Sequence, residues 1–238
     1  MKNNPSIDIA IPTRNRPEKC TVCVNSLLSG DYQNIRVFLL FTNQNELFRY
    51  AKQYQYDKRV RCEMTDYSKV STCWNTFIKR SESDFVLFLC DDTSLDSDCL
   101  TNAIASMQEH FPDGDGVVGL NVTNYPPSWP EAITQYGFRL VGRKFHARFP
   151  EGQAYCPEYY RFYVDTEMGE YAKNHVHKFV FCEDAQMQHF HPNAPGGTLD
   201  QTHYDNRGVK QKWDIEIWNA RQAKGYLWGK NYGIVGIR

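Results

Sequence analysis

The sequence predicts an α/β fold built on a doubly wound, mostly parallel sheet, and three observations lead to that prediction. Solid apolar runs at 35–41 and 85–90 are typical of strands that are buried on both faces. Segments with helical apolar spacing, 17–30 and 68–81, lie between or beside such runs. The alternation of strands and helices continues to a helix that ends before Pro112. Such alternation favours a parallel sheet with helices on both faces.

The expected elements follow that alternation along the chain. An alternating segment at 7–11 meets Pro12 and is expected to be the first strand. Pro17 opens the first helix, since proline is favoured at the first helical position, and Gly30 closes it. Further expected elements are helices at 46–56 and 68–81, a strand at 84–90, a helix to His110, a strand at 116–122, a short helix at 166–174, a strand at 178–182 and a helix near 211–223. Residues 123–163, which are rich in proline and aromatic side chains, are expected to form an irregular second half.

The composition is that of an ordinary globular protein. The 238 residues are 41% hydrophobic and 23% charged, which indicates neither disorder nor a coiled coil. The net charge of −1 gives no overall attraction to nucleic acid or to a membrane surface. The apolar runs are too short to cross a bilayer, and the polar amino terminus (MKNNPSID) shows no secretory signal. We therefore expect no membrane partner and a cytoplasmic protein, or one in the host cytoplasm if it is viral.

Eight cysteines raise the question of disulfides or zinc. Only Cys20 and Cys23 form a C-x-x-C pair, and no second pair stands at zinc-site spacing. Both fall on the apolar stripe of the first expected helix, and Cys90 ends an apolar strand. We expect buried free thiols.

Two polar loops, 12–16 and 91–96, begin where expected strands end. Ligands of doubly wound sheets bind at the carboxyl ends of the strands. Asp91 and Asp92 open the second loop, and two adjacent carboxylates repel each other unless a positive group lies beside them. A divalent cation with a diphosphate would supply that charge. The alternative is that the pair opens the turn and caps the next helix, where aspartate is favoured.

Two histidines, His189 and His191, stand in the segment QHFHP. In an extended segment their imidazoles point to the same face, which is a common geometry for metal coordination. A neutral imidazole would suit manganese as an extra ligand. A purely structural role is the alternative, but the acidic pair in the same chain favours the metal.

An acidic cluster, Asp165, Glu167 and Glu170, surrounds the expected start of a helix. Capping and a favourable interaction with the helix dipole would explain it structurally. The functional interpretation makes Asp165 a general base for an acceptor hydroxyl, with Glu167 supporting it or binding the acceptor.

Four segments together resemble the inverting GT-A glycosyltransferases of the large family 2 group, from about Ile7 to Pro192. In chain order they are IAIPTRNRPEKC, YSKVSTCWNTFIKRSESDFVLFLCDD, YVDTEMGEYAK and QHFHP. The resemblance implies a Rossmann-like GT-A fold, a nucleotide-sugar donor, and Mn²⁺ or Mg²⁺ as cofactor. The positions it implies are Pro12, Thr13, Arg14, Arg16, Ser71, Asn75 and Asp91 for the donor, Asp92, His189 and His191 for the metal, and Asp165 for the base.

The same resemblance divides the chain. Residues 1–192 would form the GT-A domain, with a nucleotide-binding half at 1–96 and an acceptor half at 97–192. It implies that Asp165 removes a proton from the acceptor hydroxyl as that oxygen attacks the anomeric carbon, with inversion. Residues 193–238 would form a C-terminal tail. A glycine pair in its first part suits a hinge, so we expect that part to be mobile without donor and to close over the diphosphate.

Two other functions share parts of this pattern. A nucleotidyltransferase that makes nucleotide sugars would have a similar sheet and metal, but it normally carries a glycine-rich basic loop after the first strand. The loop here, PTRNRP, contains no glycine. A non-catalytic sugar- or nucleotide-binding module would not need the charged positions that this chain retains.

A basic, aromatic stretch between Ala132 and Pro150 contains no acidic residue. Its functional interpretation is a site for a polyanionic acceptor, such as DNA with a modified base or a phosphate-bearing glycan or lipid. The alternative is a solvated hairpin in which RKFHARF alternates as a strand, and the acceptor would then be a neutral glycan or a protein hydroxyl. The residues interpreted as acceptor-binding are Trp129, Arg143, Lys144 and Glu167.

Overall fold

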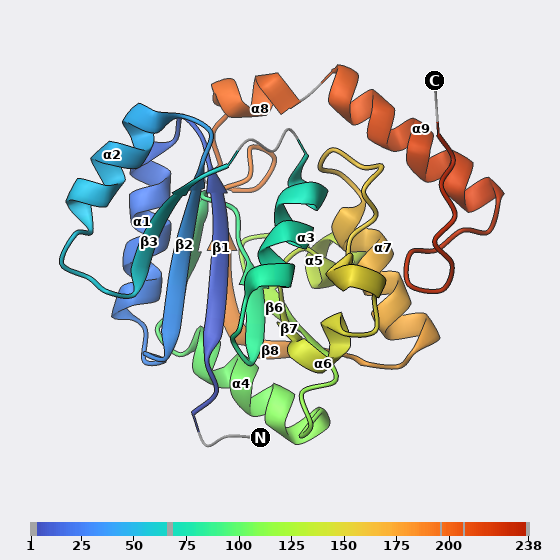
Figure 1. The fold of residues 1–238 in the computed structure, drawn as a ribbon, viewed down its shortest axis with the longest axis horizontal. Coiled ribbons are helices and arrows are strands. Elements are labelled where there is room, and N and C mark those ends of the chain that lie inside the picture. The colour runs from blue at the N-terminus through green and yellow to red at the C-terminus, as the bar shows by residue number, and fades with distance from the viewer. Residues whose placement is uncertain (1–3, 66–68, 196, 207, 237–238) are drawn as a thin grey trace.

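One sheet runs through the middle of the molecule, with helices on both faces (Figure 1). The computed structural model describes residues 4–65, 69–195, 197–206 and 208–236. Within these residues, eight strands pair in the order β3-β2-β1-β4-β7-β6-β8-β5. Their bounds are β1 (Ile7–Thr13), β2 (Ile35–Phe41), β3 (Val60–Met64), β4 (Phe85–Phe88), β5 (Thr93–Leu95), β6 (Val117–Val122), β7 (Arg139–Gly142) and β8 (Phe179–His189).

Two strands, β7 and β5, run against the direction of the others. β1 pairs in parallel with β2 and β4, β2 pairs in parallel with β3, and β6 pairs in parallel with β8. β7 lies antiparallel between β4 and β6, and β5 lies antiparallel beside β8. The prediction of a mostly parallel α/β sheet is therefore confirmed.

Helices cover both faces of the sheet, which explains why its central strands are apolar throughout. One face packs against α1, α2 and α4, and the other packs against α3, α7 and α9. The helix bounds are α1 (Pro17–Ser29), α2 (Gln44–Gln53), α3 (Val70–Arg80), α4 (Cys99–His110), α5 (Glu131–Tyr136), α6 (Arg143–His146), α7 (Val164–Glu170), α8 (Gln201–Asn206) and α9 (Val209–Ala223). In the ranges described, no helix combines the length and apolarity that a membrane crossing requires. All eight cysteines are free thiols. Five are buried, and Cys62, Cys90 and Cys182 are half-buried.

Several segments differ from the predicted elements. β7 and α5 lie within 123–163, which was expected to be irregular, and the strand expected at 178–182 continues as β8 to His189. β3 was not predicted, because its five residues lie half-exposed at the sheet edge and give a weak apolar signal. The strand expected at 84–90 ends at Phe88, and β5 follows after a turn. The alternating RKFHARF does not form a strand, since its first four residues form α6. Phe145 and His146 are both buried there, whereas neighbouring residues of a strand point to opposite faces.

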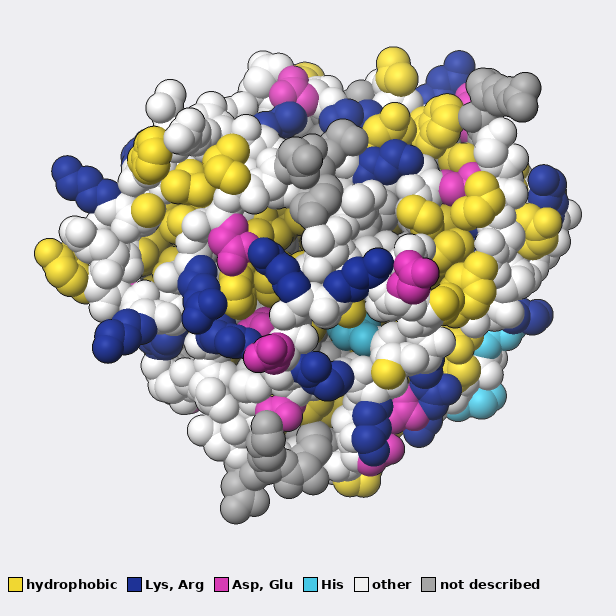
Figure 2. Space-filling view, viewed as in Figure 1, with side chains coloured by type: hydrophobic (Ala, Val, Ile, Leu, Met, Phe, Trp, Pro, Cys, Tyr) yellow, Lys and Arg dark blue, Asp and Glu magenta, His cyan; other side chains and the backbone are white. Residues whose placement is uncertain are grey.

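The two ends of the sheet carry different features. α8 lies beyond the carboxyl ends of β1 and β2 in Figure 1, and Thr202 at its start donates to the backbone oxygen of Arg14 at 2.8 Å. α6 lies at the opposite end, because Gly142 pairs with Phe85 at the beginning of β4. The C-terminal residues are part of the body of the protein. Ile217 of α9 is fully buried in the second core, and hydrophobic side chains gather over α9 and the C-terminal segment on the right of Figure 2.

Candidate active site

A cavity of about 920 Å³ opens at the carboxyl ends of β1, β2 and β4. Small-molecule sites usually have volumes of roughly 300–1,000 Å³. The predicted site residues that line it are Pro12, Thr13, Arg14, Arg16, Asp91, Trp129, Asp165, His189 and His191. Asp92 is buried directly against this lining, in contact with Arg16 and His189.

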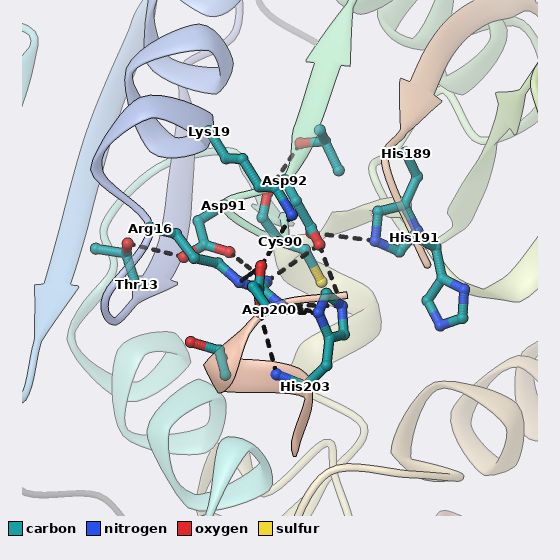
Figure 3. Close-up of polar contacts among 12 residues, drawn as sticks. Thr13, Arg16, Lys19, Cys90, Asp91, Asp92, His189, His191, Asp200 and His203 are labelled. Atoms are coloured by element: carbon teal, nitrogen blue, oxygen red, sulfur yellow. Dashed lines mark hydrogen bonds and ion pairs between the residues drawn. The ribbon is translucent and has the colours of Figure 1, made fainter. Parts of the chain in front are cut away.

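Arg16 lies between the two adjacent aspartates (Figure 3). Its Nη1 is 2.9 Å from Asp91 Oδ1 and 3.1 Å from Asp92 Oδ2. Thr13 Oγ1 donates to the other carboxylate oxygen of Asp91 at 2.8 Å. Because the Arg16 side chain is 2% exposed, solvent screens these ion pairs only weakly. The positive group expected beside the aspartates is thus an arginine, and both oxygens of Asp91 are engaged by the protein.

Asp92 and His189 form the second pair. Asp92 Oδ1 is 3.1 Å from His189 Nε2. The Tyr125 hydroxyl hydrogen-bonds with Nδ1 of the same ring, and the Asn124 side chain makes two 3.0 Å hydrogen bonds with the His189 backbone. These contacts fix the imidazole with Nε2 toward Asp92.

Burial and pairing oppose each other in setting the charges here. Burial alone would raise the pKa of Asp92, but the hydrogen bond and charge of His189 and the charge of Arg16 hold it well below the usual value. Burial alone would lower the pKa of His189, but its contacts with Asp92 and Cys90 raise it to about 9. Burial raises the pKa of Asp91, while Arg16 opposes that rise and Asp92 adds to it. Asp92 and His189 are therefore both charged when nothing else is bound.

Cys90 joins this pair as a third side chain that could ligate a metal. A ligand atom of each of Cys90, Asp92 and His189 lies within 4.8 Å of the others. In the sequence, Cys90 was marked only by its place at the end of an apolar strand. His191 lies outside this group, with its ring 5.5 Å from that of His189. Burial and the charge of His189 lower the pKa of His191 to about 4, so this ring is neutral at pH 7.

Residues of the C-terminal segment close the cluster from another side (Figure 3). Arg16 Nη2 lies 3.1 Å from Asp200 Oδ1 and 2.9 Å from both ring nitrogens of His203. Lys19 Nζ is 2.9 Å from Asp200 Oδ2. Burial alone would raise the pKa of Asp200, but the hydrogen bonds from Lys19 and Arg16 lower it. No motif marked Lys19, Asp200 or His203, and only the predicted closure of the tail pointed to this segment.

Asp165 lies in the first turn of α7, on the cavity wall. Thr166 N donates to its Oδ1 at 2.9 Å. Burial raises the pKa of Asp165, and the charge of Arg139 opposes that rise. Tyr163, just before the helix, has a φ of 65°, a left-handed conformation that is uncommon for a large side chain. A cavity carboxylate whose pKa is raised by burial has the properties of a general base.

A sequence comparison decides the family. The model of glycosyl transferase family 2 matches residues 8–167, well over half of the chain. The chain belongs to glycosyl transferase family 2. It is therefore a glycosyltransferase, and the resemblance to family 2 is confirmed over residues 8–167, a range that ends before the QHFHP segment. No curated protein sequence matches the chain.

Solved structures of other glycosyltransferases share the GT-A fold of this one. TarS 1–349 of S. aureus superimposes with a TM-score of 0.62 at 16% identity, covering 92% of this chain and 72% of that chain. TarS in complex with UDP-GlcNAc gives 0.55 at 15% identity, covering 75% and 56%. The mannosyltransferase PcManGT from Pyrobaculum calidifontis, in complex with GDP-Man and Mn²⁺, gives 0.62 at 13% identity, covering 79% and 57%. Identities this low establish the fold.

Three predicted residues of the transferase are engaged inside the protein and do not line the cavity. Ser71 Oγ donates to the Tyr159 oxygen at 2.7 Å, and Asn75 makes two hydrogen bonds with the Tyr155 backbone. Both side chains therefore fasten α3 to the segment before α7. Glu167 is 1% exposed and lies 2.8 Å from Arg221 of α9, so it anchors α7 from behind.

The two basic residues interpreted as acceptor-binding also lie outside the cavity lining. Arg143 donates to the backbone oxygens of Ser83 and Ser81 at 2.8 and 3.2 Å. Lys144 Nζ is 3.3 Å from Asp113 Oδ2. Both begin α6, at the amino ends of the parallel strands, whereas the cavity opens at their carboxyl ends. Trp129, in contrast, lines the cavity beside Tyr125, with a ring separation of 4.6 Å.

Proposed function

We propose that this glycosyltransferase moves a sugar from a nucleotide-sugar donor to an acceptor hydroxyl with inversion, with a divalent ion as cofactor. One observation carries the proposal. A single cavity is lined by Asp165, whose pKa burial raises, and by His189, whose ring is paired with Asp92. The first offers a base, and the pair offers a metal site. Family membership already restricts the chemistry to glycosyl transfer.

Asp165 is the proposed base. Its carboxylate accepts the proton of the acceptor hydroxyl while the hydroxyl oxygen forms a bond to the anomeric carbon. The bond between that carbon and the diphosphate oxygen breaks, and the electron pair leaves with the nucleoside diphosphate. Attack from the side opposite the leaving group inverts the anomeric carbon. A raised pKa brings the base closer to the working pH, where proton acceptance is more efficient.

Asp92 Oδ1 and His189 Nε2 would fit a divalent ion, which would take the place of the Nε2 proton and release it to solvent. Neighbouring ligands of an octahedral ion with bonds of about 2.1 Å lie about 3 Å apart, and these two atoms are 3.1 Å apart. Arg16 contacts the other oxygen of Asp92 and so leaves Oδ1 available. An imidazole ligand favours Mn²⁺ over Mg²⁺, while the soft sulfur of Cys90 would suit zinc better. When bound, the ion would neutralise charge on the departing diphosphate.

The acceptor is proposed to be a glycan. Trp129, Phe162 and Tyr163 line the cavity, and flat aromatic faces bind ring-shaped ligands by stacking. Arg143 and Lys144, on which a polyanionic acceptor depended, lie at the other end of the strands. Lys and Arg are interspersed with Asp and Glu on the face drawn in Figure 2, which does not favour a long phosphate chain there.

The test is a screen of UDP-, GDP-, CDP- and dTDP-sugars by thermal shift, with and without Mn²⁺. A ligand of the folded state raises the melting temperature, so one nucleotide is expected to stabilise the protein, more strongly with Mn²⁺. The sugar of that donor is then followed by NMR immediately after transfer or hydrolysis, and an inverted anomeric configuration is expected. Retention of configuration, or equal binding of the donor in EDTA, would contradict the proposal.

A further inference from the structure

The cavity contains two arginines in different electrostatic situations. Arg16 is surrounded by the carboxylates of Asp91, Asp92 and Asp200. Arg161 also lines the cavity and is half-buried, but its guanidinium makes no hydrogen bond or ion pair with any described residue. A ligand phosphate would therefore have to compete with three carboxylates for Arg16, whereas Arg161 is available.

Of the three other cations of the lining, two are engaged, and the third, Lys210 of α9, is not among the main charges that act on Asp92 or Asp165. Arg14 pairs with Asp205 at 2.9 Å, and Lys69 donates to the Pro157 oxygen at 3.1 Å. The positive charge of Arg161 acts on both Asp92 and Asp165. Arg161 therefore lies within electrostatic reach of the proposed metal pair and of the proposed base.

The backbone around Arg161 is held from α9. Asp214, which is 0% exposed, accepts hydrogen bonds from the backbone nitrogens of Tyr160, Arg161 and Phe162 at 2.7, 2.9 and 2.8 Å. Three N–H donors on one buried carboxylate fix the path of this loop, because charge-assisted hydrogen bonds are the strong ones.

Further contacts from α9 support the same loop. Trp218 stacks on the left-handed Tyr163 with ring centroids 4.9 Å apart and planes 11° apart. Arg221 pairs with Glu167 in the middle of α7. α9 begins at Val209, well after the end of the family match at residue 167. The loop and helix that carry Arg161 and Asp165 are thus built on a helix outside the matched region.

We infer that Arg161 binds the distal phosphate of the departing nucleoside diphosphate, and that Asp214 is the positioning residue that holds Arg161 in the cavity. A guanidinium presents paired donors that match a phosphate, and it needs no proton to carry its charge. The diphosphate gains negative charge as it leaves, so a cation placed in advance stabilises that state. The inference rests on the proposed function, because it assigns one residue of that same site.

The first experiment compares nucleoside diphosphate with monophosphate. Calorimetric titrations use the nucleotide that the unmodified protein binds, with Mn²⁺ present, and inorganic pyrophosphate as a probe without a base. Arg161→Gln should weaken diphosphate and pyrophosphate binding roughly ten- to hundredfold and leave the monophosphate nearly unchanged. Arg49→Gln is the matched control, since Arg49 is an exposed arginine of α2 outside the cavity lining, and it should change neither affinity.

The second experiment tests the positioning role. Asp214→Asn should weaken diphosphate binding and leave monophosphate binding nearly unchanged, as Arg161→Gln does. When Arg161→Gln is already present, adding Asp214→Asn should weaken diphosphate binding far less, because the effects of two residues that act through one contact do not add. Thermal melts establish which variants are folded, and Arg161→Gln alone decides the phosphate assignment if Asp214→Asn does not fold.

Equal weakening of diphosphate and monophosphate by Arg161→Gln, or no weakening, would overturn the inference. A change confined to the acceptor KM would overturn it too, because Arg161 would then serve the acceptor. These failures are distinct from failure of the proposed function, in which the unmodified protein itself would bind no nucleoside diphosphate.

Discussion

Two regions of the same cavity differ in how their charges are satisfied. The first is the metal-end cluster, which consists of Arg16, Asp91, Asp92 and His189. Each of its charged groups has an oppositely charged partner within 3.1 Å. The second is the α7 wall, residues 161–165, where Arg161 and Asp165 have no ion-pair partner among the described residues. Paired charges hold a rigid, prearranged cluster, whereas unpaired charges remain available to a ligand.

The largest effect is expected on the α7 wall. Asp165→Asn should lower kcat by roughly 10²–10⁴-fold, because the amide cannot accept the proton of the acceptor hydroxyl. Initial rates of nucleoside diphosphate release with saturating donor measure it. Glu170→Gln, an acid of the same helix that hydrogen-bonds Asn174, is the matched control and should retain activity. A larger loss of kcat in Glu170→Gln than in Asp165→Asn would contradict the assignment of Asp165 as the base.

The next effect concerns the metal-end cluster. His189→Ala should weaken Mn²⁺ binding by at least the roughly 10–100-fold that loss of a group supporting a metal ligand costs. Manganese titration of activity after chelation measures the shift. His110→Ala serves as the control, since that histidine ends α4 on another part of the protein. If the activity of His189→Ala depended on the Mn²⁺ concentration as that of the unmodified protein does, the metal-end cluster would not be the metal site.

The pH dependence of kcat/KM tests whether Asp165 of the α7 wall acts as the base. Asp165 must be ionised to act as a base, and burial raises its pKa. At saturating Mn²⁺, activity should therefore fall with decreasing pH around a midpoint above about 3.9, the ordinary value for aspartate. Circular dichroism over the same range separates titration from unfolding. A midpoint at or below the ordinary value would remove the electrostatic argument for Asp165.

A stability effect of a few degrees should accompany the loss of activity. Because the folded-state pKa of Asp165 is raised, ionising this group costs more in the folded state than in the unfolded chain. Its favourable contribution is present below the unfolded pKa and is lost as the pH rises through the folded pKa. Asp165→Asn should therefore raise the melting temperature at pH 7, and the difference should shrink as the pH is lowered. A lower melting temperature at pH 7 would contradict this.

The smallest effect is expected far from both regions. Lys144→Gln should leave the acceptor KM and its salt dependence unchanged, because Lys144 is 63% exposed and pairs with Asp113 at the opposite end of the sheet. Acceptor titrations at several salt concentrations test it. A clear rise in acceptor KM, together with a flatter salt response, would restore the polyanionic acceptor that the basic sequence stretch indicated.

The sheet and the strand-end loops were predictable because they depend on local patterns. Long apolar runs and helical spacing fix the layers, and in a mostly parallel sheet the polar ends of the strands meet at one edge. Asp92 and His189, which are 97 positions apart in the chain, meet at that edge because the short antiparallel β5, which was not predicted, pairs Thr93 with His189 at the end of β8. The short segments were less predictable. Five half-exposed edge residues concealed β3, and the alternation in RKFHARF did not distinguish a strand from one turn of helix.

The roles of single polar residues depend on tertiary contacts that no spacing reveals. Arg16 was expected at the diphosphate, but the structure pairs it with three carboxylates. Ser71 and Asn75 were expected at the nucleotide, but they hydrogen-bond the backbone of Tyr159 and Tyr155 and so hold α3 to the segment before the α7 wall. Asp214 lies more than fifty residues from the loop that it holds, and a lone aspartate on a helix carries no motif.

One paired titration tests the division of roles between the two regions most directly. Nucleoside diphosphate binding is measured with and without Mn²⁺ in Asp165→Asn and in His189→Ala. Asp165→Asn should bind the nucleotide as tightly as the unmodified protein, with the full gain from Mn²⁺, while its turnover is lost. His189→Ala should lose that gain from Mn²⁺. The division of roles would be contradicted if Asp165→Asn lost nucleotide affinity, or if His189→Ala kept the full gain from Mn²⁺.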